Sequence, residues 1–160
     1  MISVLYSAVI GLTQLDLKKI IAYSSITHMN FGLAGLFCND LLGIEGAIYS
    51  MFSHGLISAG LFFAVGVLYE RYKSRLVAYY GGLSSVMPLF SSIFFFFVVA
   101  NVGIPPLSGF MSEILVLFGL TTATNKVLIL ALFSSSIILT INFFWLYNRV
   151  CSGPVNVHLN

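Results

Sequence analysis

Charged side chains are scarce in this sequence. Of its 160 residues only 8% are Asp, Glu, Lys or Arg, whereas a soluble domain carries about 25%. The formal net charge of +2 is too small to indicate binding to nucleic acid. Because 59% of the residues are hydrophobic and the mean hydropathy is +1.02, the sequence predicts an integral membrane protein in contact with lipids.

Cysteine is nearly absent, and no signal-peptide pattern is recognisable. Cys38 and Cys151 show neither metal-ligand nor redox spacing, so we predict no metal site. The N-terminal run lacks a basic segment before it and a small-residue cleavage site after it, which predicts a retained span. No low-complexity segment interrupts the chain, and we expect one transmembrane domain over residues 1–150 followed by a polar tail over 151–160.

The sequence is instead built from apolar runs. A transmembrane helix needs about 20 predominantly apolar residues. Five runs approach or exceed that length: residues 2–15, 19–38, 43–69, 87–121 and 126–148. They predict an all-α integral membrane fold with about five transmembrane helices.

The fourth run is too long for one crossing and contains the adjacent prolines Pro105 and Pro106. Pro105 and Pro106 each remove a backbone donor and clash with the carbonyl one turn earlier, and the residue before a proline leaves helical dihedrals. We therefore predict a discontinuous helix, with halves over about 87–103 and 106–121. Pro106 or Leu107 would begin the second half, because proline fits the first turn of a helix.

Basic residues gather on one predicted side of the membrane. With five crossings, that side carries six of the seven Lys and Arg residues: Lys18, Lys19, Arg71, Lys73, Arg75 and Arg149. The other side carries Asp40, Glu45 and Lys126. By the positive-inside rule the basic side faces the cytoplasm or matrix, which places the N-terminus outside and the C-terminus inside. If the fourth run formed two full crossings, the number of basic residues on the more basic side would be unchanged. Only the shortness of the second half of this run favours a single crossing.

Three titratable side chains are predicted to lie near mid-membrane. At a rise of about 1.5 Å per residue, His28 lies about 15 Å from Lys18 along the second run. His54 reaches a similar depth from the opposite side, and Glu113 lies about two turns into the second half of the broken helix. We therefore expect groups from three helices to converge at one level.

Hydroxyl side chains accompany both histidines on their helices. The candidates are Ser24, Ser25, Thr27, Ser50, Ser53 and Ser58. Residues 50, 54 and 58 share one helical face, and aligned hydroxyls around an imidazole suit a file of water that passes protons near neutral pH. The small residues Gly55, Ala59 and Gly60 predict close approach of another helix.

Most of these residues also have a purely structural interpretation. The serines could only hold helices together, the histidines could be satisfied core residues, and Lys18 could anchor a helix end at the membrane surface. Glu113 differs, because an ionised carboxylate at the bilayer centre costs at least about 2.5 kcal/mol. A neutral, paired or hydrated carboxyl beside a helix break predicts a proton or ion site.

Four ordered motifs carry a resemblance that extends over nearly the whole chain. They are "LDLKKIIAYSSITHMNFGLAGL", "MFSHGLISAGLFF" followed by "LYER", "GGLSSVMPL" and "GIPPLSGFMSEILVL". In this order and spacing the sequence resembles the antiporter-like membrane subunits of respiratory NADH–ubiquinone oxidoreductase, complex I. The "HGLISAGLFF" stretch favours the subunit 4 branch of that family.

The resemblance implies the second of two inverted helical repeats, with its broken helix at Pro105–Pro106. It implies a proton pathway through Glu113, His54 and His28, with Lys18 on the inner side. Arg75 resembles a basic loop position, for which anchoring is the simpler role. The first repeat and the final span of the family are absent from this sequence, so we expect a split subunit whose first half is a separate polypeptide.

The function implied by the resemblance is proton translocation as part of the NADH:ubiquinone reductase, with no catalytic redox site in this chain. FMN, iron–sulfur clusters and ubiquinone would be held elsewhere in the complex, and antiporter-like subunits 2 and 5 would be neighbours. The expected location is the mitochondrial inner membrane, or alternatively a bacterial plasma membrane. Two alternatives stay open, namely a module of a cation/proton antiporter or membrane hydrogenase, and a structural assembly subunit without transport.

Overall fold

The computed structural model describes residues 2–38, 40–122 and 126–155, and the described chain is all-α as the sequence predicts. Its helices are α1 Ile2–Thr13, α2 Leu17–Leu36, α3 Leu41–Tyr72, α4 Leu83–Val86, α5 Pro88–Val102, α6 Ser108–Thr122 and α7 Lys126–Cys151, with a 3-10 turn, η1, at Val77–Tyr79. By length and composition α3 and α7 could each cross a membrane, and α1, α5 and α6 are apolar but shorter.

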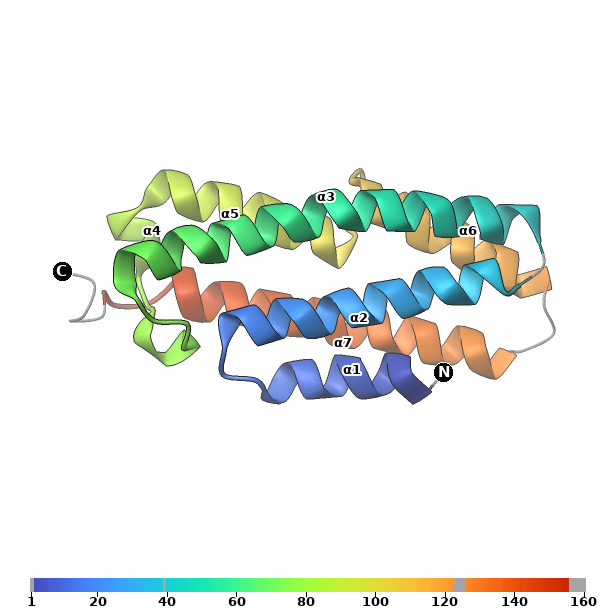
Figure 1. Ribbon diagram of the computed structural model, residues 1–160, viewed down its shortest axis with the longest axis horizontal. Helices are drawn as coiled ribbons and strands as arrows, with labels where there is room; N and C mark the ends of the chain where they lie inside the picture. Colours follow the sequence, from blue (N-terminus) through green and yellow to red (C-terminus); the bar gives the residue numbers. More distant parts are fainter. Residues whose placement is uncertain (1, 39, 123–125, 156–160) are drawn as a thin grey trace.

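The long helices lie side by side along one axis, and two of them follow each other end to end (Figure 1). Helix α3 runs the length of the bundle by itself. Helix α5 begins near α4 at one end, and α6 continues from mid-length to the other end, where the chain turns back into α7. The α5–α6 connection therefore lies near the middle of the bundle.

The end of α5 is set by a glycine. Gly103 adopts φ 75° and ψ 43°, a left-handed conformation that favours glycine. Its N–H donates to the carbonyl of Ala100 at 3.3 Å, and the N–H of Ile104 donates to that of Val99 at 3.4 Å. These bonds close the last turn of α5 just before the two prolines.

Helix α6 begins at Ser108, so the predicted start at Pro106 or Leu107 is wrong by one or two residues. The reason is a separate turn, in which the N–H of Leu107 donates to the carbonyl of Ile104 at 3.0 Å. Both prolines lie in this connection, joined by a cis peptide bond.

Helices α3 and α6 pack backbone to backbone through glycine. A Cβ atom on Gly46 would lie 2.7 Å from the backbone nitrogen of Val116, and one on Gly119 would lie 2.5 Å from Cα of Gly43. Small residues at such positions let helices approach closely. These contacts hold the helix that carries Glu113 against the helix that carries His54.

Of the three small residues predicted to allow close approach of another helix, only Gly60 does so. A Cβ on Gly55 would meet nothing within 4 Å, and Ala59 is exposed. Gly60 does contact a neighbour, because the ring of Phe97 on α5 lies 2.3 Å from the position of a Cβ there. The sequence motif has the right residue type, but helical phase turns the first two away from the other helices.

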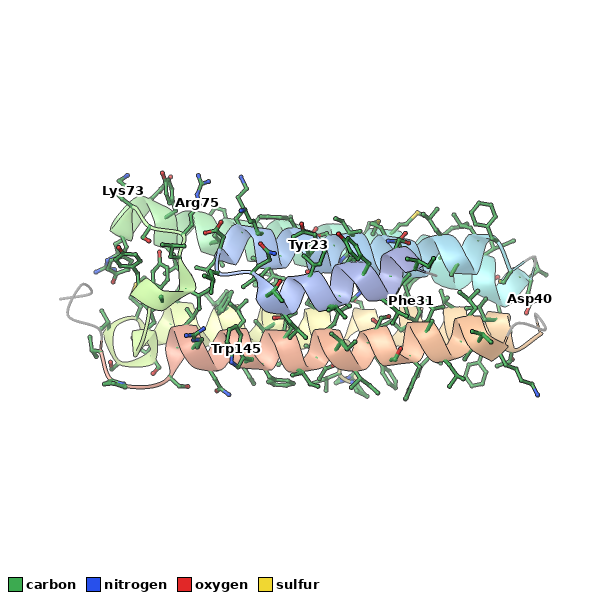
Figure 2. The ribbon with its side chains drawn as sticks, turned by 90° about the horizontal axis from the view of Figure 1, so that it is seen from below. Tyr23, Phe31, Asp40, Lys73, Arg75 and Trp145 are labelled. Carbon is green, nitrogen blue, oxygen red and sulfur yellow. The ribbon has the colours of Figure 1, made fainter. Side chains whose placement is uncertain are left out.

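Unlike Glu113, the charged residues labelled in Figure 2 lie at the two ends of the bundle. Figure 2 shows Lys73 and Arg75 at one end and Asp40 at the other. At the basic end the segment after α3 pairs with the α1–α2 connection, since the N–H of Leu17 donates to the carbonyl of Arg75 and the N–H of Val77 to that of Leu15, both at 2.9 Å. The guanidinium of Arg75 also lies 4.4 Å from the ring centre of Tyr69, which supports the anchoring role.

The side chain of Tyr80 stabilises the loop over residues 73–82 at the basic end. Its hydroxyl donates to the carbonyl of Ser74 at 2.6 Å. Burial raises the pKa of the Tyr80 phenol, and nearby Tyr72 adds to the shift. Because the protonated phenol is favoured in the fold, this contact stabilises the loop at neutral pH and is lost as the pH rises past the folded-state pKa, above about 10.

Replacing Tyr80 with Phe should therefore loosen this loop without changing the helices. The lost hydrogen bond corresponds to about 1 kcal/mol, so limited proteolysis at neutral pH should cleave residues 73–82 faster in the variant. Above the phenol pKa the two proteins should be cleaved at similar rates. Equal cleavage at neutral pH would show that the hydroxyl does not hold the loop.

Candidate functional site

A small cavity lies where α2 and α3 pass the α5–α6 connection. Its volume is about 10 Å³, roughly the space of one water molecule. The lining residues come from α2, α3, α5 and α6: His28, Ser50, Ser53, His54, Ile57, Ala100, Asn101, Gly109, Ser112 and Glu113. The predicted convergence of His28, His54 and Glu113 is therefore present in the structure.

His28 is the centre of this group. Its Nδ1 lies 3.5 Å from Oε1 of Glu113, and its ring centroid lies 5.0 Å from that of His54, with a tilt of 31° between the planes. The side chains of His28 and Glu113 are 11% and 17% exposed. An imidazole and a carboxyl at this distance form a charged pair when the proton is on His28 and a neutral pair when it is on Glu113.

Glu113 has a second contact, on α7. The hydroxyl of Ser136 donates to Oε2 of Glu113 at 3.3 Å, so both carboxyl oxygens face a polar group. On the opposite wall the hydroxyl of Ser53 donates to that of Ser108 at 2.8 Å, which joins α3 to the first residue of α6. The carboxyl is thus positioned by contacts to α2 and α7 at once.

The predicted hydroxyl residues divide into two groups. Ser50 and Ser53 line the cavity. The hydroxyls of Ser24 and Ser25 both donate to the carbonyl of Ile21 in their own helix. A hydroxyl that is bonded to its own helix in this way reinforces local structure and is not directed toward the cavity.

Thr27 and Ser58 also lie away from the cavity. Thr27 shares a 2.7 Å hydroxyl–hydroxyl contact with Ser7 of α1, and the hydroxyl of Ser58 donates to the carbonyl of Gly55. The stripe predicted along α3 therefore reaches the cavity only through residues 50 and 54. For Thr27 and Ser58 the helix-packing interpretation fits the structure better.

Lys18 lies apart from the group. It is exposed in the first turn of α2, and ten residues of helix separate it from His28, or about 15 Å. Its neighbour Lys19 pairs with Asp16 at 3.3 Å. The structure does not bring Lys18 to the cavity, and its position suits a side chain that anchors a helix end.

Several polar residues of the site were not predicted from the sequence, among them Ser112, which lines the cavity next to Glu113 in the chain. Asn101 lines the cavity from the last turn of α5, and Ser136 reaches Glu113 from α7. Asn101 interrupts an apolar run three residues before Ile104, which is a usable signal. Ser136 belongs to the triplet "SSS" at 134–136, in which the sequence does not distinguish the member that faces Glu113.

Comparison with known proteins assigns the family. Residues 1–148 match the family described as "NADH:quinone oxidoreductase/Mrp antiporter, TM". The chain belongs to this family. The resemblance found in the four sequence motifs is thereby confirmed, and so is the prediction of a transmembrane protein.

Relatives in this antiporter family are close in sequence but much longer. NADH-ubiquinone oxidoreductase chain 4 of Arabidopsis thaliana is 51% identical over 153 residues, which is 95% of this chain and 30% of that protein. NADH-quinone oxidoreductase subunit M of Rhodobacter capsulatus is 44% identical over 155 residues, 96% of this chain and 30% of the relative. The chain thus spans just under a third of the length of these two antiporter-family proteins.

Solved structures in the antiporter family share the fold. A chain of respiratory complex I from Thermus thermophilus with bound NADH superposes with a TM-score of 0.91 at 29% identity, over 97% of this chain and 33% of that chain. A chain of the Mrp complex from Dietzia sp. DQ12-45-1b gives a TM-score of 0.91 at 21% identity, over 96% of this chain and 29% of that one. The second likeness concerns the fold alone.

Proposed function

We propose that this chain contributes a proton-transfer site to the membrane arm of a respiratory NADH:quinone oxidoreductase. The observation that carries the proposal is the 3.5 Å contact between Nδ1 of His28 and Oε1 of Glu113 in a small cavity beside the helix break. Relatives named NADH-ubiquinone oxidoreductase chain 4 and the fold shared with a complex I chain support it.

In this proposal Glu113 accepts and releases the proton, and the two histidines relay it. Carboxyl and imidazole groups are suited to this because each exists in two protonation states under physiological conditions once its surroundings are tuned. The rings of His28 and His54 are adjacent, so a proton that leaves Glu113 has a route across α2 to α3. A change in charge or hydration elsewhere in the complex would shift the balance between the neutral and charged pairs.

The membrane arrangement that we propose has about five crossings. Helices α5 and α6 together form one discontinuous crossing, and α1, α2, α3 and α7 form the others, as the second inverted repeat of the antiporter-like fold. The clustering of basic residues at one end of the bundle supports an N-terminus toward the intermembrane space and a C-terminus toward the matrix. The membrane would be the mitochondrial inner membrane or, in a bacterium, the plasma membrane.

The partners and cofactors are part of the same proposal. Because the chain spans 30% of its chain 4 relative, the remainder of the family fold would have to be present in the assembly. We predict that a separate polypeptide supplies the first half, that antiporter-like subunits 2 and 5 are neighbours, and that FMN, iron–sulfur clusters and ubiquinone bind to other subunits.

Purification through an affinity tag on this chain tests the assembly. The proposal predicts that quinone-reducing subunits co-purify with it and that NADH oxidation drives proton uptake or release across reconstituted vesicles. Isolation of antiporter or hydrogenase subunits without a quinone-reducing arm would assign the chain to one of those modules instead. The same preparation provides the wild-type reference for the variants below.

Replacing His54 with Phe separates transport from assembly. Phenylalanine keeps an aromatic ring next to His28 but cannot carry a proton. We expect normal amounts of complex and normal quinone reduction, with proton transfer per NADH lowered severalfold. Tyr49→Phe, which removes a polar group from an exposed position on the same helix, is the control and should match wild type. Loss of complex in the His54 variant, with normal proton transfer in what remains, would support the structural-subunit alternative.

A further inference from the structure

Asn101 is a buried amide without a hydrogen-bond partner. It lies in the last turn of α5, it is one of the residues that line the cavity, and it is 3% exposed. Neither its Nδ2 nor its Oδ1 is bonded to any described residue. A buried amide that is left unpaired destabilises the fold, because its polar atoms have lost their water without gaining a partner, so such an amide normally has a bound partner.

His28 presents a second unpaired group to the same cavity. Its Nδ1 faces Glu113, but its Nε2 is buried and has no partner among the described residues. The main chain of Asn101 is also within hydrogen-bonding reach of this imidazole. Two hydrogen-bonding residues from different helices thus line one cavity, and each has at least one buried side-chain atom without a side-chain partner among the described residues.

The size of the cavity selects the ligand. Its volume of about 10 Å³ matches one water molecule and excludes a larger ligand. A buried water needs two to four polar partners, and the amide of Asn101, Nε2 of His28 and the hydroxyl of Ser50 can provide them. Because Asn101 is almost fully buried, a neighbouring subunit cannot reach its amide to replace this water.

We propose that Asn101 is a positioning residue whose side-chain amide holds one water molecule against Nε2 of His28, so that the imidazole has a proton-transfer partner on each side. This inference rests on the proposed proton-transfer function. It adds a water molecule on the side of the His28 ring away from Glu113. An asparagine suits the position because its amide both donates and accepts, and it can therefore orient a water toward either tautomer of the histidine.

The proton balance of this step is simple. An excess proton that arrives at the water is passed to Nε2, and the proton on Nδ1 passes to the carboxylate of Glu113. The water is neutral again, the imidazole is neutral with its proton on the other nitrogen, and Glu113 is protonated. The imidazole returns to its first tautomer when Glu113 releases its proton and the ring turns or exchanges protons with His54.

Asn142 provides a matched control. It is also an asparagine with both amide atoms unpaired among the described residues, and it is 1% exposed. Asn142 lies on α7, where its Nδ2 is 3.0 Å from the position of a Cβ on Gly11 of α1, and it does not line this cavity. The same substitution at the two sites therefore compares the same loss of a buried amide at two places.

The experiment compares Asn101→Leu with Asn142→Leu in the assembled complex, reconstituted in vesicles. Leucine has the same number and branching of side-chain heavy atoms as asparagine, but methyl groups replace its polar atoms. We expect Asn101→Leu to keep quinone reduction but lower proton transfer per NADH severalfold and to shift its pH profile, because the partner of Nε2 is removed. Asn101→Ser supplies a hydroxyl in place of the amide and leaves more room for water, so this variant should recover part of the loss. Asn142→Leu should retain the wild-type ratio and pH profile.

A structure of the wild-type complex at a resolution that shows ordered water is the second measurement, and it does not depend on the stability of any variant. It should show a water between Asn101 and Nε2 of His28. An empty cavity, or equal effects of Leu at positions 101 and 142, would overturn the role of Asn101. If Glu113→Gln stops proton transfer while Asn101→Leu has no effect, this inference fails and the proposed function stands; if neither has an effect, the proposed function fails.

Discussion

Replacing Glu113 with glutamine should abolish most proton transfer through this chain and leave the complex assembled. Glutamine has the shape of glutamate, and its amide oxygen can still accept the hydroxyl of Ser136, which lies 3.3 Å from Oε2 in the wild type. It cannot take up a proton from His28. Because a positioned acid or base contributes on the order of a hundredfold or more to a proton-transfer step, the loss should be of that size.

Proton transfer per NADH oxidised in reconstituted vesicles measures this effect, and the amount of intact complex is measured in parallel. Glu45→Gln is the matched control, because it makes the same chemical change at an exposed residue near the start of α3. That variant should behave as wild type. Normal proton transfer in the Glu113 variant would mean that the carboxyl is a structural group, and the proposed role would have to be abandoned.

The group around Glu113 could be predicted because each member violates the apolar pattern of its helix. His28, His54 and Glu113 lie far from the ends of their helical runs, and the constant helical rise gives their depth. A proline pair marks the break in the same way, since it forbids continuous helix. The apolar pattern, the proline rule and the helical rise were therefore sufficient to predict the depth of the three central side chains and the order of the helices.

Other parts of the site depend on helical phase, which the sequence does not give. Ser58 and Ser50 are separated by about two turns, yet only Ser50 lines the cavity. Ser136 reaches Glu113 because α7 packs with that side inward, and a run of three serines contains no sign of which one does so. Weak amphipathic patterning is typical of helices that contact lipid on one side and protein on the other, because both surroundings are apolar.

The glycine contacts between helices also depend on helical phase, which the sequence does not give. Gly46 and Gly55 lie on one helix, nine residues apart, and by sequence either could meet a neighbouring helix. The structure turns Gly46 toward α6 and leaves Gly55 open. Which glycine matters is decided by the position of the partner helix, and that position follows from contacts far away along the chain.

Replacing Gly46 with alanine should therefore damage the complex, whereas Gly55→Ala should not. The new methyl group at position 46 would lie 2.7 Å from the backbone nitrogen of Val116 and 2.8 Å from Cβ of Leu115. Backbone atoms cannot rotate away, so α6 must move by about 0.7 Å to restore an ordinary contact of 3.4 Å. Overpacking of this kind costs about 1–3 kcal/mol.

The displacement would also carry Glu113, one turn before Val116, away from His28. We expect less assembled complex, a lower midpoint of thermal inactivation and weaker coupling in the surviving fraction, because proton transfer between groups already 3.5 Å apart declines as they separate. Gly55→Ala adds the same methyl group where nothing lies within 4 Å, and the higher helix propensity of alanine, about 1 kcal/mol over glycine, should leave stability unchanged or raise it. Equal stability and coupling in both variants would show that α6 is not held by this glycine contact, and the position of Glu113 would then have to be fixed by α7 through Ser136.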